Sequence, residues 1–193
     1  VANTTGQYNS FMGYNAGLTN TTGSSNVFIG NQAGYTNSVG QWNTFIGYQA
    51  GYTNNDSYNS FIGYQAGRAN TIGSYNSFFG YNTGLSNTTG DNNVFIGTES
   101  GRTNTTGIKN VLIGYQAGFT SNASYNSIIG YQAGYFTTTG NHNAFIGYNA
   151  GYSNTTGYYN AFMGYVAGFS NTTGWGNVFI GSNSGMSNTT GNV

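Results

Sequence analysis

Few side chains in this sequence could carry acid–base or metal chemistry. The one histidine is His142, and the acidic residues are Asp56, Asp91 and Glu99. A general acid or base needs a positioned partner, yet none of the three acids lies near His142 in the repeat described below. The acids also occupy different positions of that repeat, so they cannot stack into a carboxylate pair or a site for a hard cation. We therefore expect no enzyme, no catalytic residue, no cofactor and no metal site.

Asparagine offers another kind of chemistry, because Asn-x-Ser/Thr is the acceptor sequence for N-linked glycans. Nine candidate glycosylation sites of this type occur: Asn3, Asn20, Asn55, Asn87, Asn104, Asn122, Asn154, Asn171 and Asn188. Asn-Thr-Thr-Gly is also an ordinary turn sequence, since Asn begins turns and glycine adopts positive φ. Both interpretations stay open, and the host's transferase would decide between them.

Tyrosine recurs at two fixed positions of the repeat. The first set is Tyr48, Tyr64, Tyr115, Tyr131, Tyr148 and Tyr165, and the second is Tyr35, Tyr52, Tyr135 and Tyr152. Stacked tyrosines bind the faces of carbohydrates, but they more often pack together with the hydroxyl left in water. We favour packing, with surface carbohydrate as a further candidate partner.

These residues are positioned by a five-residue motif, Asn-x-Phe-Ile-Gly, that recurs eleven times. The motif ends on Gly13, Gly30, Gly47, Gly63, Gly80, Gly97, Gly114, Gly130, Gly147, Gly164 and Gly181. These glycines lie 17 residues apart in eight of ten intervals and 16 apart in the other two. A short fixed period that continues from end to end predicts a solenoid, in which each repeat is one coil resting on the next. We expect an all-β, parallel β-solenoid of about eleven 17-residue coils and a single domain over residues 1–193.

The asparagine of the motif is present in every copy: Asn9, Asn26, Asn43, Asn59, Asn76, Asn93, Asn110, Asn126, Asn143, Asn160 and Asn177. Equivalent residues of a solenoid lie one above another, so their side-chain amides can form a hydrogen-bonded ladder along the axis. We therefore expect an Asn ladder with a structural role, because a binding site would need the residue in one coil only.

The Phe and Ile of the motif point to opposite faces of the strand, so one of the two must face outward. The position before Phe is Ser, Thr, Ala or Val and shares a face with Ile, and small and branched residues suit a narrow interior. We therefore expect an outward, self-associating Phe stripe: Phe11, Phe28, Phe45, Phe61, Phe78, Phe95, Leu112, Ile128, Phe145, Phe162 and Phe179. The alternative, with Phe inside and Ile outside, also leaves an apolar stripe exposed.

Charged residues make up 3% of the chain and the formal net charge is zero. This composition excludes a basic surface for nucleic acid and electrostatic binding to an anionic membrane. No apolar run is long enough for membrane insertion in this segment. The absence of cysteine leaves neither disulfides nor thiolate metal sites, and a solenoid needs neither.

The string Asn-Val-Phe-Ile-Gly-x-x-Ala/Ser-Gly, at residues 26–34, 93–101 and 177–185, resembles the head repeats of trimeric autotransporter adhesins. The longer Asn-Thr-Thr-Gly-x-x-Asn-x-Phe-Ile-Gly string is similar to solenoid repeats of bacterial and phage tail fibres. This resemblance implies a left-handed roll and a parallel homotrimer. The sequence departs from the adhesin repeat in its longer period and in Phe replacing a smaller residue.

The function that we expect is the structural shaft of an extracellular or phage fibre, on a cell surface or virion, that self-associates through the Phe stripe and supports adhesion. Val1 and Val193 both fall inside a repeat, so we expect a segment of a longer fibre protein. One alternative is a functional-amyloid-like polymer of solenoids joined end to end. Another is an ice-binding solenoid that uses the threonines of Asn-Thr-Thr, although adjacent threonines do not both face one flat side.

Overall fold

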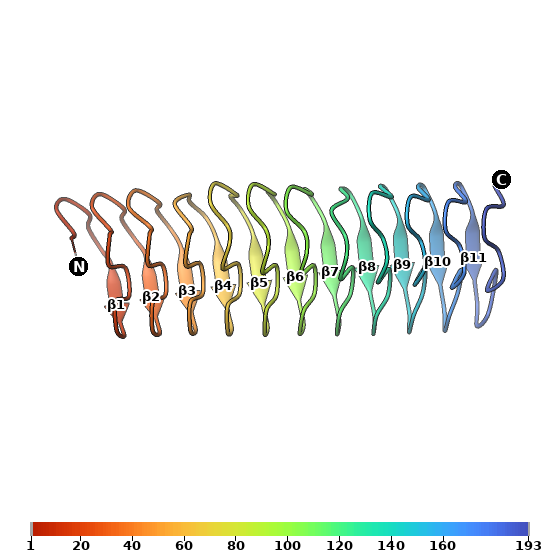
Figure 1. Cartoon of the computed structure of the whole chain (residues 1–193), viewed down its shortest axis with the longest axis horizontal. Coiled ribbons are helices and arrows are strands. Elements are labelled where there is room, and N and C mark those ends of the chain that lie inside the picture. The colour runs from red at the N-terminus through yellow and green to blue at the C-terminus, as the bar shows by residue number, and fades with distance from the viewer. Residues whose placement is uncertain (1, 193) are drawn as a thin grey trace.

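Eleven short strands lie side by side in chain order and form one parallel sheet along the molecule (Figure 1). The structure is a computed structural model that describes residues 2–192. The strands are β1 (Ser10–Met12), β2 (Val27–Ile29), β3 (Thr44–Ile46), β4 (Ser60–Ile62), β5 (Ser77–Phe79), β6 (Val94–Ile96), β7 (Val111–Ile113), β8 (Ser127–Ile129), β9 (Ala144–Ile146), β10 (Ala161–Met163) and β11 (Val178–Ile180). These residues contain no helix and form an all-β, parallel β-solenoid of about ten turns with coils of about 17 residues.

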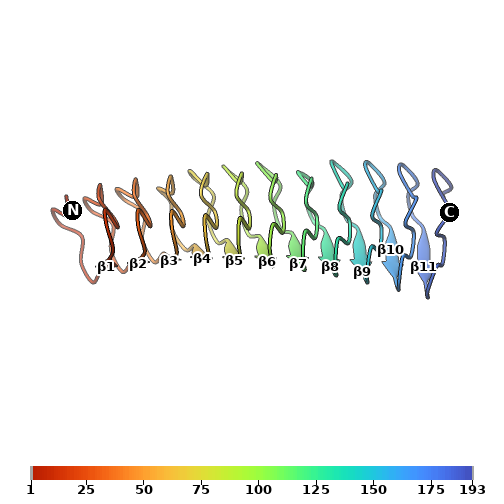
Figure 2. The ribbon, with the colours of Figure 1, turned by 60° about the horizontal axis from the view of Figure 1, so that its bottom comes forward.

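Each strand pairs in register with the equivalent residues of the next coil. Phe45 of β3, for example, pairs with Phe61 of β4, and Ile46 pairs with Ile62. The turned view of Figure 2 places the strands along one edge of the solenoid and the loops along the opposite edge. Because the register never slips, every position of the repeat becomes a column that runs along the axis.

Two glycines shape each coil, as Gly47 and Gly51 illustrate. Gly47 has φ 136°, and a Cβ there would collide with the carbonyl of Gly63 in the next coil. Gly51 has φ 57°, and a Cβ there would lie 2.7 Å from the ring of Phe45. Glycine is therefore needed for conformation and for close approach at both positions. The first glycine sets how closely coils stack, and the second makes room for the ring inside.

Two further residues in each coil have positive φ although they are not glycine. Gln49 has φ 53° and Tyr58 has φ 63°, and the equivalent residues of nearly all other coils share these values. This left-handed conformation costs an L-residue about 1 kcal/mol or more. At the first of these positions Gln side chains form hydrogen bonds between coils, with Gln49 Nε2 donating to Gln32 Oε1 at 2.8 Å. Packing and hydrogen bonding between coils thus hold a backbone that a single coil would not favour.

The expectation that the Phe stripe faces outward is wrong, because its residues form the core. Phe28, Phe45, Phe61, Phe78, Phe95, Leu112, Ile128, Phe145 and Phe162 are fully buried, and Phe11 and Phe179 are partly buried against them. Successive Phe rings stack with centroids 4.7 to 5.0 Å apart. Alanine and glycine opposite the strand leave the interior wide enough for a ring. The alternative interpretation is correct: Ile and the residue before Phe form the outer face.

Candidate functional site: the side-chain ladders

The Asn residues of the motif are buried, except for half-buried Asn9, and they join each coil to the next mostly through hydrogen bonds to the backbone. Asn59 Oδ1 accepts from the backbone N–H of Asn76 at 3.0 Å, and Asn59 Nδ2 donates to the carbonyl of Gly73 at 2.8 Å. Bonds of the first kind link this column from Asn9 to Asn177. Direct amide-to-amide bonds occur at Asn110–Asn93 and Asn177–Asn160. Each Asn therefore satisfies buried donors and acceptors at the entrance to the strand.

A second Asn column forms the amide-to-amide ladder that sequence reasoning missed. Its members are Asn3, Asn20, Asn37, Asn54, Asn70, Asn87 and Asn104, and after a gap Asn154, Asn171 and Asn188. After the first member of each run, every Nδ2 donates to the Oδ1 of the Asn in the coil before it, over 2.6 to 3.3 Å. The signal was present, because Asn fills this position in nearly every repeat. It begins the Asn-Thr-Thr-Gly segment, and turn chemistry explained it equally well.

This ladder corrects the list of candidate glycosylation sites. Asn20, Asn87, Asn104, Asn154 and Asn171 are fully buried, so a glycan on their Nδ2 would not fit inside the folded coil. Asn3, Asn55 and Asn122 are exposed, and Asn188 is half-buried. The turn interpretation therefore accounts for the five buried residues.

The second ladder is interrupted in two neighbouring coils, where Ser121 and Thr137 replace Asn. Three buried side-chain atoms here lack a hydrogen-bond partner within residues 2–192: Asn104 Oδ1, Ser121 Oγ and Thr137 Oγ1. The Phe stack is interrupted in the same region, since Leu112 and Ile128 lie between Phe95 and Phe145. In these coils, therefore, both the second Asn ladder and the Phe stack are interrupted.

Aromatic residues form ladders on the outside as well. Tyr48, Tyr64 and Tyr81 stack at 5.2 Å between centroids, and a second run from Tyr115 to Tyr165 stacks at 5.0 to 5.3 Å. Phe119, Tyr135, Tyr152 and Phe169 form another run at the second tyrosine position. Burial, followed by the neighbouring Tyr152, raises the pKa of Tyr135. Inside a run, neighbours cover both faces of each ring, which is packing of the kind favoured from the sequence.

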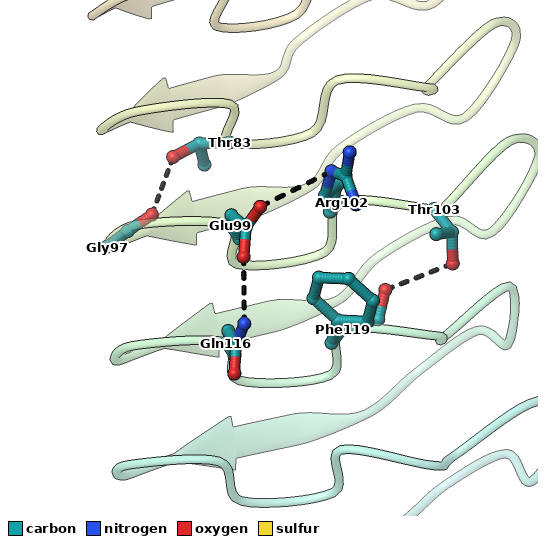
Figure 3. A network of polar contacts seen from close by, with 7 residues as sticks. All are labelled: Thr83, Gly97, Glu99, Arg102, Thr103, Gln116 and Phe119. Carbon is teal, nitrogen blue, oxygen red and sulfur yellow. Dashed lines mark hydrogen bonds and ion pairs between the residues drawn. The ribbon is translucent and has the colours of Figure 1, made fainter.

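Two of the charged residues, Glu99 and Arg102, form a small cluster with Gln116 and Phe119 (Figure 3). Arg102 pairs with Glu99 at 3.5 Å, and Glu99 accepts a hydrogen bond from Gln116 Nε2 at 2.8 Å. The Arg102 guanidinium also lies 5.5 Å from the centroid of the Phe119 ring. Glu99 and Gln116 continue the Gln column, so the ion pair belongs to an inter-coil ladder.

The remaining candidates for acid–base chemistry lie apart from this cluster. His142 stacks on Tyr125 at 4.8 Å, whereas Asp56 and Asp91 each accept a hydrogen bond from a backbone N–H. Residues 2–192 contain no pocket and no group of three His, Cys, Asp or Glu side chains placed to bind a metal. No helix in this part of the chain is long and apolar enough to cross a membrane.

Many threonine hydroxyls of the loops are engaged with the backbone. Thr155 Oγ1 donates to the carbonyl of Thr172 in the next coil at 3.0 Å, and Thr21, Thr71, Thr88, Thr138 and Thr172 make the equivalent bond. These hydroxyls stabilise the stack of coils. They are the side chains that the ice-binding alternative would place on its flat face, so the structure offers that alternative no support.

No protein-family model, no curated protein and no solved structure matches this chain.

Proposed function

We propose that this chain is a structural shaft, a stiff rod that holds other parts of a fibre at a fixed distance. The observation that carries the proposal is the unbroken register of eleven strands, which continues in the columns of Asn, Phe and Tyr. At a strand spacing of about 4.8 Å the sheet is about 50 Å long. The same types of side chain recur from coil to coil, as expected when the function of the rod depends on its length and stiffness.

Several kinds of contact between coils support stiffness. Three kinds of contact join the coil of β4 to the coil of β5. They are the strand pairing of the sheet, the hydrogen bond from the Asn76 backbone N–H to Asn59 Oδ1, and the stacked rings of Phe61 and Phe78. Bending the rod would open all of these contacts together on one side. Most are uncharged, so the shaft should keep its form over a wide range of salt concentration.

We further propose that the shaft lies outside the cell or on a virion, that it supports adhesion, and that its coils are left-handed. These proposals rest on the similarity of the repeat to adhesin and tail-fibre repeats, and the neutral, cysteine-free composition is compatible with them.

The shaft proposal is tested by removing whole coils. Deletion of residues 63–113 removes three coils and joins Ile62 to Gly114, which continues the repeat. The shortened chain should fold, and its maximum dimension in small-angle X-ray scattering should fall by about 15 Å. Deletion of residues 63–105 joins the chain out of phase and should disrupt folding at the junction. A compact particle whose length does not follow coil number would contradict the proposal.

A parallel homotrimer is a second candidate, favoured by the outward Ile column rather than by the buried Phe stripe. Ile96, Ile129 and Ile146 are exposed on the strand face, together with Met163. If this column joins three copies, the mass in solution should be that of a trimer, and Ile96→Asp with Ile146→Asp should reduce it to a monomer that remains folded. A monomeric parent chain would contradict the trimer, and the shaft would then be a single solenoid.

A further inference from the structure

The exposure of the tyrosines on the strand face follows a simple rule at the position that comes two residues after each strand. Where the next coil also has Tyr there, as for Tyr48, Tyr64, Tyr115, Tyr131 and Tyr148, the side chain is 42% to 45% exposed. Where the next coil has a smaller residue, exposure rises to 70% for Tyr14, 50% for Tyr81 and 56% for Tyr165. Each ring is therefore covered mainly by the following coil, and these three have a bare face.

The same rule holds at the position that comes two residues before each strand. Tyr58 and Tyr125 are each followed one coil later by an aromatic ring and are 43% exposed. Tyr8, Tyr75 and Tyr159 are followed by Ser25, Asn92 and Gly176 and are 84%, 57% and 60% exposed. Bare tyrosine faces therefore occur both before and after the strands, along the two edges of the outer strand face.

The bare faces occur in pairs that flank the same strand. Tyr8 and Tyr14 flank β1, Tyr75 and Tyr81 flank β5, and Tyr159 and Tyr165 flank β10. The strand that follows each pair is β2, β6 or β11, and all three have the sequence Val-Phe-Ile. In place of tyrosines, Ser25 and Asn31 flank β2, Asn92 and Thr98 flank β6, and Gly176 and Ser182 flank β11. We call each of these three regions, where both outer aromatic columns are interrupted, a trough.

The β6 trough lies inside the rod and shows the arrangement best. Its floor is the outward pair Val94 and Ile96, and Asn92 and Thr98 stand at its two ends. The bare faces of Tyr75 and Tyr81 bound it on one side, and Lys109 and Tyr115 follow in the next coil on the other. The six residue steps from Asn92 to Thr98 span less than about 20 Å, because only Val94–Ile96 is strand while Asn92 and Gly97 have φ 58° and 124°.

We propose that each trough binds a short neutral oligosaccharide that lies along the strand. Bare tyrosine faces stack on the apolar faces of pyranose rings, and the two tyrosines of a pair engage two separate rings of one chain. Asn with Ser or Thr at the ends of the β2 and β6 troughs, and Ser182 at one end of the β11 trough, donate and accept hydrogen bonds, as sugar hydroxyls require. The ends of the β2 and β11 troughs carry no charged residue. Beside the ends of the β6 trough lie Asp91, Glu99 and Lys109, which together carry more negative than positive charge, so this trough also disfavours an anionic glycan.

The experiment uses NMR of the isotopically labelled chain, titrated separately with cellotetraose, tetraacetylchitotetraose, maltotetraose and mannotetraose. At least one sugar should shift the ring resonances of Tyr75 and Tyr81 and leave those of the covered Tyr64 and Tyr131 unchanged. Asn92→Tyr with Thr98→Tyr continues both columns and covers both faces. Tyrosine is the most frequent residue at both positions. At the position of Asn92, Tyr58 and Tyr75 adopt φ 63° and 56°, close to the 58° of Asn92.

This filled variant should bind at least about tenfold more weakly at the β6 trough. Binding at the β2 trough of the same molecule should not change, which provides an internal control. Thr89→Tyr adds a tyrosine on the loop face and should have no effect. The inference is overturned if no sugar shifts the bare rings, or if binding at β6 persists in the filled variant.

The inference also rests on the proposal that a single solenoid serves as the shaft, because the strand face must be open. The mass of the chain is therefore measured in the same sample. A trimer that buries the strand face would contradict the proposed glycan sites but not the proposal that the protein is a structural shaft.

Discussion

Ser121 lies one coil after Asn104 and cannot continue its hydrogen-bonded ladder. In the coil before, Asn104 Nδ2 donates to Asn87 Oδ1 at 2.7 Å, whereas Asn104 Oδ1 and Ser121 Oγ are buried without a partner within residues 2–192. A buried polar atom without a hydrogen bond costs about 1 to 3 kcal/mol. The interruption should therefore weaken the internal structure of the rod at these two coils.

Completing this ladder should stabilise the protein. Ser121→Asn with Thr137→Asn restores the residue found at this position in nearly every coil, and Asn54 shows that a 16-residue coil accommodates it. We expect a gain of about 1 kcal/mol per restored hydrogen bond, measured by chemical denaturation. The control is Ser86→Asn, a change of the same type at a position outside the ladder, which should give no such gain. A loss of stability in the double variant would show that the interruption is required by packing.

Removing one member of the motif's Asn column should be costly. Asn93 Oδ1 accepts from the backbone N–H of Asn110 at 3.0 Å, and Asn93 Nδ2 donates to the carbonyl of Gly107 at 2.8 Å. Asn93→Ala leaves both groups buried and unpaired, so we expect a loss of about 2 to 4 kcal/mol in denaturation experiments. Exposed Asn31 provides the control, and Asn31→Ala should change stability by less than about 0.5 kcal/mol. Equal effects of the two changes would contradict the ladder.

The buried Phe column should respond to volume more than to aromatic character. Phe78 is fully buried between Phe61 and Phe95, with centroids 4.8 and 4.7 Å away. Phe78→Ala should cost about 3 to 5 kcal/mol because it leaves a cavity. Phe78→Leu should cost less than about 1.5 kcal/mol, since Leu112 fills the same position in another coil. Thermal melts compare the two variants, and a Phe78→Ala protein as stable as its parent would place the ring outside.

Stability should decline at alkaline pH because of Tyr135. Burial raises the pKa of Tyr135 above its ordinary value of 10.0 in the folded chain. The folded state therefore retains the proton longer than the unfolded state does, so this contribution is fully present below pH 10 and is lost as the pH rises through the folded pKa. Ultraviolet titration of the phenolate and melts above pH 10 measure it. Tyr135→Phe, which copies Phe119 and Phe169, should remove this part of the decline.

The sequence predicts the coil more reliably than it predicts which residues lie inside. Spacing of the motif glycines gives the period, the parallel strands and the corners, because each follows from local conformation repeated at a fixed interval. Alternation along the strand shows that Phe45 and Ile46 face opposite ways, but not which way. That choice depends on how far the opposite wall, at Ala50 and Gly51, stands from the strand. This distance is set only when the coil closes.

Closure of the coil also decides the role of the second Asn column. A local sequence such as Asn87-Thr88-Thr89-Gly90 fits an exposed turn and a buried ladder equally well. Burial of Asn87 and its bond to Asn70 depend on a neighbour 17 residues away. The bare faces of Tyr75 and Tyr81 likewise depend on residues of the next coil, so they become visible only when sequential copies are stacked.

The second Asn ladder gives the rod an electric dipole along its axis. Its donors all point toward the coil that comes earlier in the chain, as Asn171 Nδ2 does toward Asn154 Oδ1, and the Gln column points the same way at Gln65 and Gln49. Aligned amide dipoles add, as they do in an α-helix, so the early end of the stack is relatively positive and the late end relatively negative. Two such stacks meeting late end to late end would present acceptor to acceptor. Only a head-to-tail meeting would extend the ladder, so the rod has a plus end and a minus end.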